Sequence, residues 1–148
     1  MTPLLSLCMI VKNEEKVLRR CLASVQDLVD EMIIVDTGST DSTKAIAYEF
    51  TSNVYDFEWG NDFSAAKNEA IRKAKGKWIL VLDADEYVQP EGKEELKRFL
   101  SGLDPKQPIG FLLPIVNFVG AREDNKTMES YAARLFPNHP DLYYTSPI

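Results

Sequence analysis

Three carboxylates end an apolar run in the stretch KWILVLDADE, which spans residues 77–86. Asp83 and Asp85 are two positions apart, so along an extended chain they should project to the same side, with Glu86 directly behind them. Carboxylates this close together repel one another, and their oxygens suit a hard divalent cation such as Mg²⁺ or Mn²⁺. An acidic loop that caps the next helix and lies in solvent explains this stretch equally well.

A second polar cluster follows another apolar run, in IIVDTGSTDST at residues 33–43. Asp36 stands where the strand should end, and Gly38 permits a tight turn after it. An aspartate in this place can accept hydrogen bonds from a nucleobase N–H or from ribose hydroxyls, or it can merely brace its turn. For Ser39, Thr40 and Asp41 the favoured interpretation is the capping of a helix. The sequence contains neither a P-loop nor a dinucleotide-binding glycine pattern.

Alternating strands and helices should position these clusters. The apolar patterns predict strands at 4–11, 31–36, 52–57 and 77–83, and helices at 13–26, 39–50, 61–76 and from Pro90 to about Leu100. Asn13 should cap the first helix, Asn61 or Asp62 the third, and Gly76 should end the third. Two further strands, 111–119 and 130–136, suit an antiparallel hairpin or a sheet edge.

This order predicts an α/β protein with a mainly parallel mixed sheet flanked by helices. Ligands of such sheets bind at the carboxyl ends of the strands. The first strand ends at Val11–Asn13, the second at Asp36–Ser39 and the fourth at Asp83–Glu86. We therefore expect the polar groups of all three segments to meet at one edge.

Composition narrows the function further. The chain has 148 residues, 17 basic and 23 acidic, with a formal net charge of -6. We therefore expect one domain, residues 1–148, and no nucleic-acid partner, because no basic excess exists to neutralise phosphates. No apolar stretch reaches the roughly 20 residues that span a bilayer, and we see no signal peptide. Cys8 and Cys21 are expected as buried free thiols, which favours the cytoplasm.

The stretches SLCMIVKNEEKVLRRCLASV, EMIIVDTGSTDST, DFSAAKNEAIRKAKGKWILVLDADE and YAARLFPNHPDL, in this order, resemble family 2 glycosyltransferases. The resemblance covers residues 4–142 and is strongest to the branch with M-I-V-K-N-E in its first strand. It implies the nucleotide-diphospho-sugar transferase fold (glycosyltransferase A type), here truncated. It also implies inverting transfer of a hexosyl-type sugar from a nucleoside diphosphate donor, by default a UDP-sugar. The acceptor, whether glycan, lipid or protein, is left open, as are a homo-oligomer and peripheral attachment to the inner membrane face.

The resemblance also implies roles on the nucleoside side of the site. Ile10 and Val11 would line the nucleobase pocket, Glu14 would support that pocket or the nucleoside, and Asp36 would bond the base. Lys67 would approach the ribose or the phosphates, although a solvated helix lysine is a plausible alternative.

On the diphosphate side, the resemblance identifies DAD as the family's D-x-D signature. Asp83 would face the ribose or metal-bound water, and Asp85 would ligate a Mn²⁺ or Mg²⁺ that bridges the diphosphate. Glu86 would either support these aspartates or begin a helix.

Two departures from the family pattern leave the base open. Ile10-Val11-Lys12 stands where Pro-x-Tyr is common, so no aromatic ring can stack on the base from there. Asp36-Thr37 stands where tandem aspartates are frequent.

The sequence does not supply a clear catalytic base. In resembling enzymes the base lies downstream of the strand that matches AARLF, and Asp141 is the weak candidate here. We therefore expect donor binding without efficient transfer, and a non-catalytic nucleotide-sugar-binding module or an inactive truncated homologue are the alternatives. A haloacid dehalogenase-type phosphatase is disfavoured, because Tyr87 stands where its signature needs Thr or Val.

Overall fold

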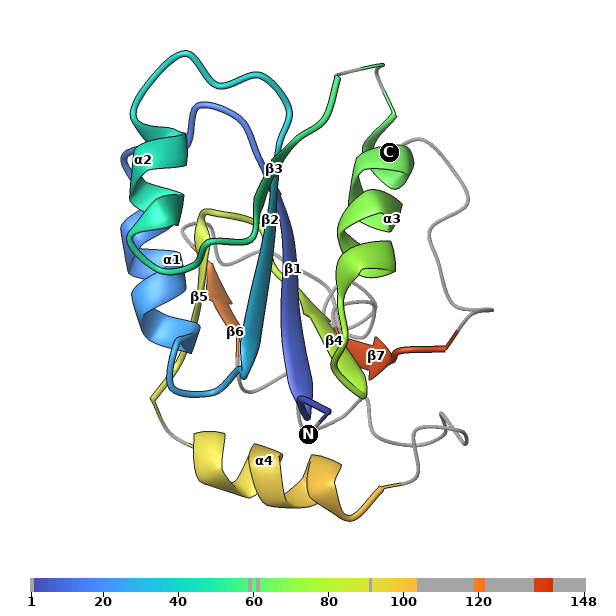
Figure 1. The fold of residues 1–148 in the computed structure, drawn as a ribbon. Helices are drawn as coiled ribbons and strands as arrows, with labels where there is room; N and C mark the ends of the chain where they lie inside the picture. Colours follow the sequence, from blue (N-terminus) through green and yellow to red (C-terminus); the bar gives the residue numbers. More distant parts are fainter. Residues whose placement is uncertain are drawn as a thin grey trace.

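A five-stranded sheet forms the centre of the molecule. The computed structural model describes residues 2–58, 60, 62–90, 92–103, 119–121 and 135–139. In the sheet the strand order is β3-β2-β1-β4-β7. These strands are β1 (Leu5–Val11), β2 (Glu31–Asp36), β3 (Val54–Asp56), β4 (Trp78–Val81) and β7 (Leu135–Pro137). The first four run parallel and β7 runs antiparallel to β4, which confirms the mainly parallel mixed sheet (Figure 1).

Helices cover both faces of this sheet. Helices α1 (Leu18–Val25) and α2 (Thr43–Tyr48) share a buried apolar cluster with the side chains of Leu7, Trp78 and Leu80. Helix α3 (Phe63–Lys73) contributes to a second cluster on the other face, with Ile33 and Ile79. Helix α4 (Lys93–Ser101) lies at the end of the sheet where β1 begins.

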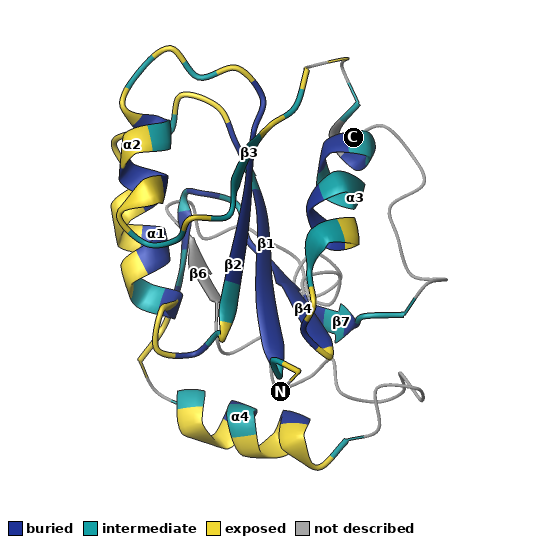
Figure 2. Ribbon diagram, in the orientation of Figure 1, coloured by how far each residue is buried: buried dark blue, intermediate teal, exposed yellow. Residues whose placement is uncertain are grey.

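Burial explains why the strands read as continuous apolar runs. Every residue of β4 is buried, and β1 is buried except at Ile10 (Figure 2). A strand with both faces covered gains from an apolar side chain at each position, so no alternation appears in the sequence.

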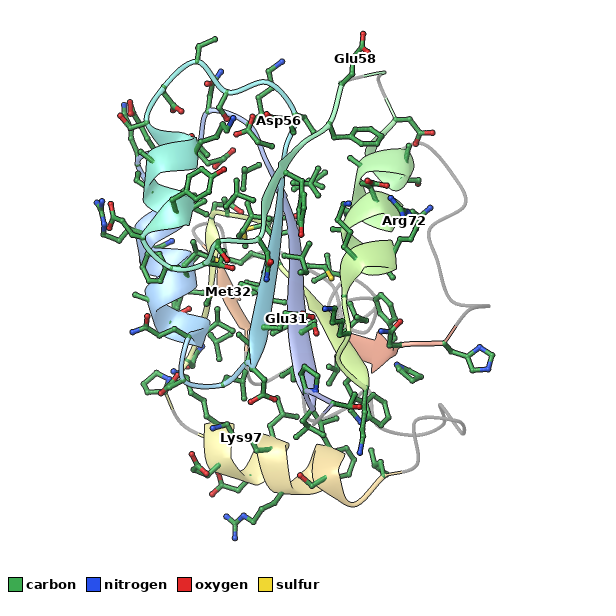
Figure 3. All side chains as sticks on the ribbon, viewed as in Figure 1. Glu31, Met32, Asp56, Glu58, Arg72 and Lys97 are labelled. Atoms are coloured by element: carbon green, nitrogen blue, oxygen red, sulfur yellow. The ribbon has the colours of Figure 1, made fainter. Side chains whose placement is uncertain are left out.

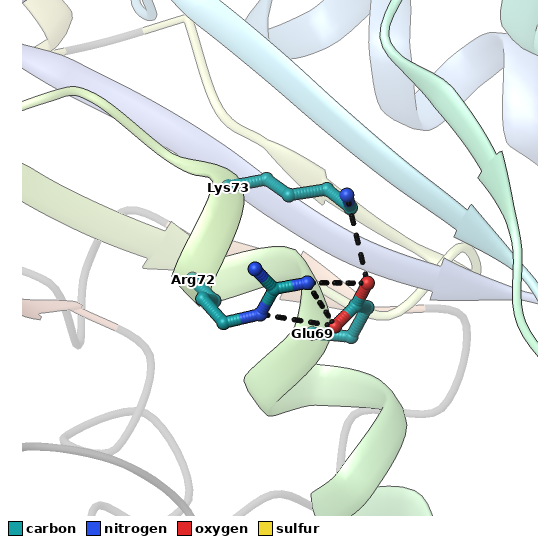
Figure 4. A network of polar contacts seen from close by, with 3 residues as sticks. All are labelled: Glu69, Arg72 and Lys73. Atoms are coloured by element: carbon teal, nitrogen blue, oxygen red, sulfur yellow. Dashed lines mark hydrogen bonds and ion pairs between the residues drawn. The ribbon is translucent and has the colours of Figure 1, made fainter.

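Helix α3 is stabilised by a cap at its start and by polar contacts of Glu69 and Lys73. Asp62 Oδ1 accepts the Ala65 N–H at 3.2 Å, so the predicted cap is confirmed. Glu69 accepts hydrogen bonds from Arg72 at 2.7 and 2.9 Å and lies 3.5 Å from Lys73 Nζ (Figure 4). Lys73 Nζ also lies 4.3 Å from the centre of the Tyr55 ring, which ties α3 to β3.

The sequence predicted that Gly76 would end α3, and this prediction is wrong. The helix ends at Lys73, and Gly76 instead allows two segments to approach closely. A Cβ atom at this position would lie 2.4 Å from Ser6 Oγ and 2.9 Å from Ser6 N, inside β1.

The starts of the other helices were also predicted wrongly. Helix α1 begins at Leu18 rather than at residue 13, and Asn13 takes a left-handed conformation with φ 53° instead of capping it. Helix α2 begins at Thr43 rather than at residue 39. Helix α4 begins at Lys93 rather than at Pro90, after Gly92 with φ 84°.

A second, small sheet was not predicted. Strand β5 (Glu86–Val88) pairs antiparallel with β6 (Val119–Ala121). The expected hairpin between 111–119 and 130–136 is therefore wrong for the described residues, because β6 pairs with β5 and β7 pairs with β4. The alternative of a sheet edge is confirmed by β7. The rest of those two predicted strands lies outside the described residues.

The prediction of buried free thiols is confirmed. Cys8 and Cys21 are both free and buried. Burial raises the pKa of each thiol far above its usual range, and nearby carboxylates, Glu31 for Cys8 and Glu86 for Cys21, add to the effect.

Candidate functional site

The candidate site lies at the carboxyl ends of the parallel strands. We use "the rim" for the segments that end or follow three of them, residues 10–15 after β1, 36–43 after β2 and 83–86 after β4. β1 lies between β2 and β4 in the sheet, so these segments leave neighbouring strands at the same end. The convergence predicted from the strand ends is therefore present in the fold.

Asp36 is a buried charged group of the rim, with 2% of its surface exposed. The N–H groups of Gly38 and Ser39 each donate to its Oδ1 at 2.8 Å, and Gly38 has φ 116°, which only glycine adopts easily. The second carboxylate oxygen, Oδ2, is buried and accepts no hydrogen bond from the residues that the structure describes. Asp36 thus braces its turn with one oxygen and keeps a buried acceptor for a donor from outside.

Lysine and aspartate side chains flank Asp36. Asp56 lies opposite it on β3, and Lys44 of α2 pairs with Asp56 at 2.8 Å. The hydrogen bond with Asp56 raises the pKa of Lys44, and the charge of Asp36 adds to this shift.

The segments after β1 and β2 are held together by their polar side chains. Ser39 Oγ accepts the Asn13 N–H at 2.9 Å, and Asn13 Oδ1 accepts the Thr40 N–H at 2.8 Å. Thr43 Oγ1 accepts the Glu14 N–H at 2.8 Å and also bonds Asp41. This second bond holds the pKa of Asp41 below its usual range. Residues expected to cap helices therefore build the rim itself.

The remaining predicted nucleoside residues occupy different environments. Ile10 is half-buried at the end of β1, whereas the Val11 side chain is 3% exposed within the core. The Val11 carbonyl accepts from the N–H and the hydroxyl of Thr37. Glu14 is half-buried within the rim, and Lys67 is half-buried on α3.

The D-x-D segment forms a turn rather than an extended strand end. The Glu86 N–H donates to the Asp83 carbonyl at 3.0 Å, and Glu86 Oε1 accepts the Asp83 N–H at 2.7 Å. The alternation expected of an extended chain therefore does not govern Asp83 and Asp85, both of which are half-buried. Glu86 is fully buried as the first residue of β5, so its assignment to a helix start is wrong.

The chemistry of this turn fits a Mg²⁺-like cation with a phosphate ligand. Such cations take one or two carboxylates and complete their shell with water and phosphate oxygens. Among the residues that the structure describes, no three His, Cys, Asp or Glu side chains converge as a complete cage. Asp83 and Asp85 would thus supply part of a coordination shell. Asp141, the candidate base, lies outside the described residues.

The opposite end of the sheet carries a hollow of about 480 Å³ that includes Asp30, Glu31 and Met32 in its lining. Figure 3 labels Glu31 and Met32 at this end and Asp56 at the other. Asp30 accepts two N–H groups from the start of β1, and Glu31 accepts the Ser6 hydroxyl at 2.6 Å. Because both carboxylates already bind the fold, we place the candidate site at the rim.

The sequence profile of glycosyl transferase family 2 matches residues 6–140, which include all three rim segments. The chain belongs to glycosyl transferase family 2. The resemblance seen in the sequence is therefore confirmed.

Among the curated relatives of this family 2 chain are two proteins named as glycosyltransferases and one named for its TPR repeats. A TPR repeat-containing protein of Synechococcus elongatus is 46% identical over 145 residues, which cover 96% of this chain and 34% of that protein. The glycosyltransferase SunS of Bacillus subtilis is 38% identical over 66% of this chain and 24% of its own length. The putative glycosyltransferase EpsH of B. subtilis is 31% identical over 97% of this chain and 42% of its own length. The family 2 chain thus spans less than half of each of these relatives.

Solved structures confirm the glycosyltransferase A-type fold. The crystal structure of Staphylococcus aureus TarS superimposes with a TM-score of 0.58 at 25% identity, covering 66% of this chain and 32% of that one. Glucosyl-3-phosphoglycerate synthase of Mycobacterium tuberculosis, solved with Mn²⁺ and UDP, gives a TM-score of 0.51 at 23% identity over 57% of this chain and 34% of its own. None of the described helices of the family 2 chain has the length and apolarity to cross a membrane.

Proposed function

We propose that this chain is the donor-binding part of an inverting glycosyltransferase that uses a nucleoside diphosphate-sugar and a divalent cation. The observation that carries the proposal is Asp36 Oδ2, which lies on the same rim as the D-x-D turn. This buried carboxylate oxygen has no donor among the described residues. Leaving such an acceptor unpaired costs free energy, which a ligand donor would recover. Membership of family 2 supports the same function.

On the nucleoside side, Asp36 accepts an N–H of the base or a ribose hydroxyl at Oδ2. Ile10, half-buried on the α3 face of the sheet, would line the base pocket, and Glu14 and Lys67 would lie near the nucleoside. Val11 acts through its carbonyl, which fixes Thr37 and with it the turn that carries Asp36.

On the diphosphate side, Asp83 and Asp85 hold Mn²⁺ or Mg²⁺ together with the phosphate oxygens. The bound cation would neutralise negative charge that develops on the leaving diphosphate. The buried Glu86 side chain accepts the Asp83 N–H and so stabilises the turn that carries both aspartates. Inverting transfer also needs a base within reach of the acceptor hydroxyl, and Asp141 stays the candidate for that role.

Uridine is the proposed base and a hexose the proposed sugar. TarS has been crystallised with UDP and with UDP-GlcNAc, and the M. tuberculosis synthase with UDP-glucose and Mn²⁺. These ligands belong to proteins with the same fold, which supports a UDP-sugar here.

Calorimetry with UDP, in the presence and absence of Mn²⁺, tests the proposal. Asp85→Asn should weaken UDP binding in Mn²⁺ roughly tenfold or more, because the amide is a poor ligand for a hard cation. Its affinity for uridine should not change. Asp27→Asn is the matched control, since Asp27 pairs with Lys93 on the surface and should leave both affinities at the parent value. Equal UDP affinity of the parent and Asp85→Asn in Mn²⁺ contradicts the metal assignment, and a GDP panel tests the base.

A nucleotide-sugar-binding chain without transfer is the second candidate. It keeps the nucleotide and cation residues of the rim and lacks only the transfer step. Incubation of the 148-residue chain with a UDP-sugar and candidate acceptors separates the two functions. Turnover beyond slow donor hydrolysis identifies the chain as a complete transferase.

A further inference from the structure

Helix α1 contacts the D-x-D turn through main-chain atoms of both aspartates. Arg20 donates a guanidinium N–H to the Asp85 carbonyl at 3.1 Å. Next to it, the Cys21 thiol donates to the Asp83 carbonyl at 3.7 Å. Neither bond uses a carboxylate oxygen, so the groups proposed to ligate the cation are not consumed by them.

The same helix also holds the strand that follows the turn. The Arg20 guanidinium carbon lies 4.6 Å from the centre of the Tyr87 ring, a distance at which a cation and an aromatic face attract each other. One turn further along α1, Ser24 Oγ accepts the Val88 N–H at 2.9 Å and donates to the Cys21 carbonyl at 2.7 Å. Residues 83–88 thus make four contacts with α1.

The turn needs such support because it lies beyond the described strand pairs of the sheet. Strand β4 ends at Val81. Val81 is its last residue paired with β1, and Leu80 is its last residue paired with β7. Among the described residues, the strand pairs of the sheet therefore stop before Asp83 and Asp85. A pair of metal ligands must be held closely in place, and supporting groups of this kind govern metal affinity strongly.

We propose that Arg20 is a positioning residue for the cation and diphosphate site, acting through the Asp85 carbonyl and the Tyr87 ring. This inference rests on the proposed function and adds a residue from α1 that touches neither ligand. Of the two adjacent arginines on α1, Arg20 faces the turn, whereas Arg19 pairs with Glu49 of the segment after α2 at 2.7 Å. Arg19 therefore offers a matched control on the same helix.

The experiment compares Arg20→Gln, Arg20→Lys and Arg19→Gln with the parent by calorimetry, with uridine and with UDP, each in the presence and absence of Mn²⁺. For Arg20→Gln we expect roughly a tenfold loss of UDP affinity in Mn²⁺. The uridine affinity and the thermal midpoint should stay close to those of the parent. Arg20→Lys keeps the charge but loses the planar stack, so it should recover part of the loss. Arg19→Gln should bind all ligands as the parent does.

Tyr87→Leu tests the route through the aromatic ring. If Arg20 is oriented by the ring, Tyr87→Leu should reproduce part of the Arg20→Gln effect, and the double variant should lose no more than Arg20→Gln alone. The spectrum of bound Mn²⁺ in electron paramagnetic resonance gives a further measure, because a displaced turn should alter the ligand geometry.

The outcomes separate the two proposals. If the parent binds UDP in Mn²⁺ and Arg20→Gln binds it within twofold of the parent, the positioning role is wrong and the proposed function stands. If Arg20→Gln loses uridine and UDP affinity in parallel, its effect is a general one on the fold, and the positioning role is again wrong. If the parent itself binds no UDP in Mn²⁺, both proposals fail.

Discussion

At the scale of the residue, Asp36 divides its two oxygens between structure and ligand. Oδ1 accepts two N–H groups of its own turn, and Oδ2 is buried with no donor in the described part of the chain. The sequence left two interpretations open for this residue, a ligand acceptor or a brace for the turn. In the structure the brace is present, and the second oxygen leaves room for the other role as well.

Replacing Asp36 by Asn tests the ligand role with little change in shape. The amide oxygen can still accept the N–H groups of Gly38 and Ser39. The amide NH₂ takes the place of Oδ2, and because it is a donor it cannot accept a hydrogen bond from the ligand. We expect binding of uridine and UDP to weaken roughly tenfold, whether or not Mn²⁺ is present. N3-methyluridine should likewise bind the parent poorly if the donor is the base N–H.

The control for this change is Asp56→Asn, which alters the neighbouring aspartate on β3. Its side chain is 74% exposed and pairs with Lys44. Calorimetry should give parent-like affinities for this variant. An Asp36→Asn protein that binds uridine as tightly as the parent would exclude the nucleobase role.

At the scale of the element, the strands were predicted better than the helix starts. Strands β1 and β2 lie within one residue of their predicted bounds, because an apolar run buried on both faces is a local signal. The helix starts failed where Asn13 and Ser39 bind partners in another loop rather than their own helix. Such pairings join residues more than 25 positions apart and leave no local pattern.

The candidate site shows the same division between local and distant signals. Asp36, Asp83 and Asp85 could be found because each follows an apolar strand. The contact of Arg20 with the turn could not be found, because an arginine on the polar side of a predicted helix looks like any solvated residue. Strands β5 and β6 were missed because three residues each are too few to show a period, and their pairing is distant in the chain.

The close approach of Gly76 to β1 leads to a prediction about stability. Gly76→Ala should lower the free energy of unfolding by about 3 kcal/mol, because the new methyl group meets the backbone of a central strand that cannot move aside. Gly102→Ala is the control, since its nearest atoms lie at 3.7 Å and its φ is ordinary. Urea unfolding of both variants measures the difference, and equal stability of the two would show that β1 yields to the methyl group.

At the scale of the whole molecule, the two buried thiols make stability depend on pH. Their pKa values are raised in the folded state, so above about pH 8.5 the unfolded chain loses thiol protons while the folded chain keeps them. The unfolded state then binds fewer protons, and stability falls as pH rises. The expected slope is up to about 1.4 kcal/mol per pH unit for each thiol.

Urea unfolding between pH 8 and pH 10 measures this slope (roughly the range in which free thiols ionise). The variant with both Cys8→Ala and Cys21→Ala should show a clearly flatter dependence, even if its stability at neutral pH is lower. Identical slopes in the parent and the double variant would mean that the thiols ionise in the folded protein.

The strand order also bears on how a growing chain can fold during synthesis. β1 is made first but sits in the middle of the sheet, and its second neighbour, β4, begins at Trp78. β4 in turn is covered on its outer side by β7, which begins at Leu135. Until those residues leave the ribosome, β1 and then β4 present a bare edge to other chains. A nascent chain of this protein therefore passes through a long interval in which its most apolar strands need protection from aggregation.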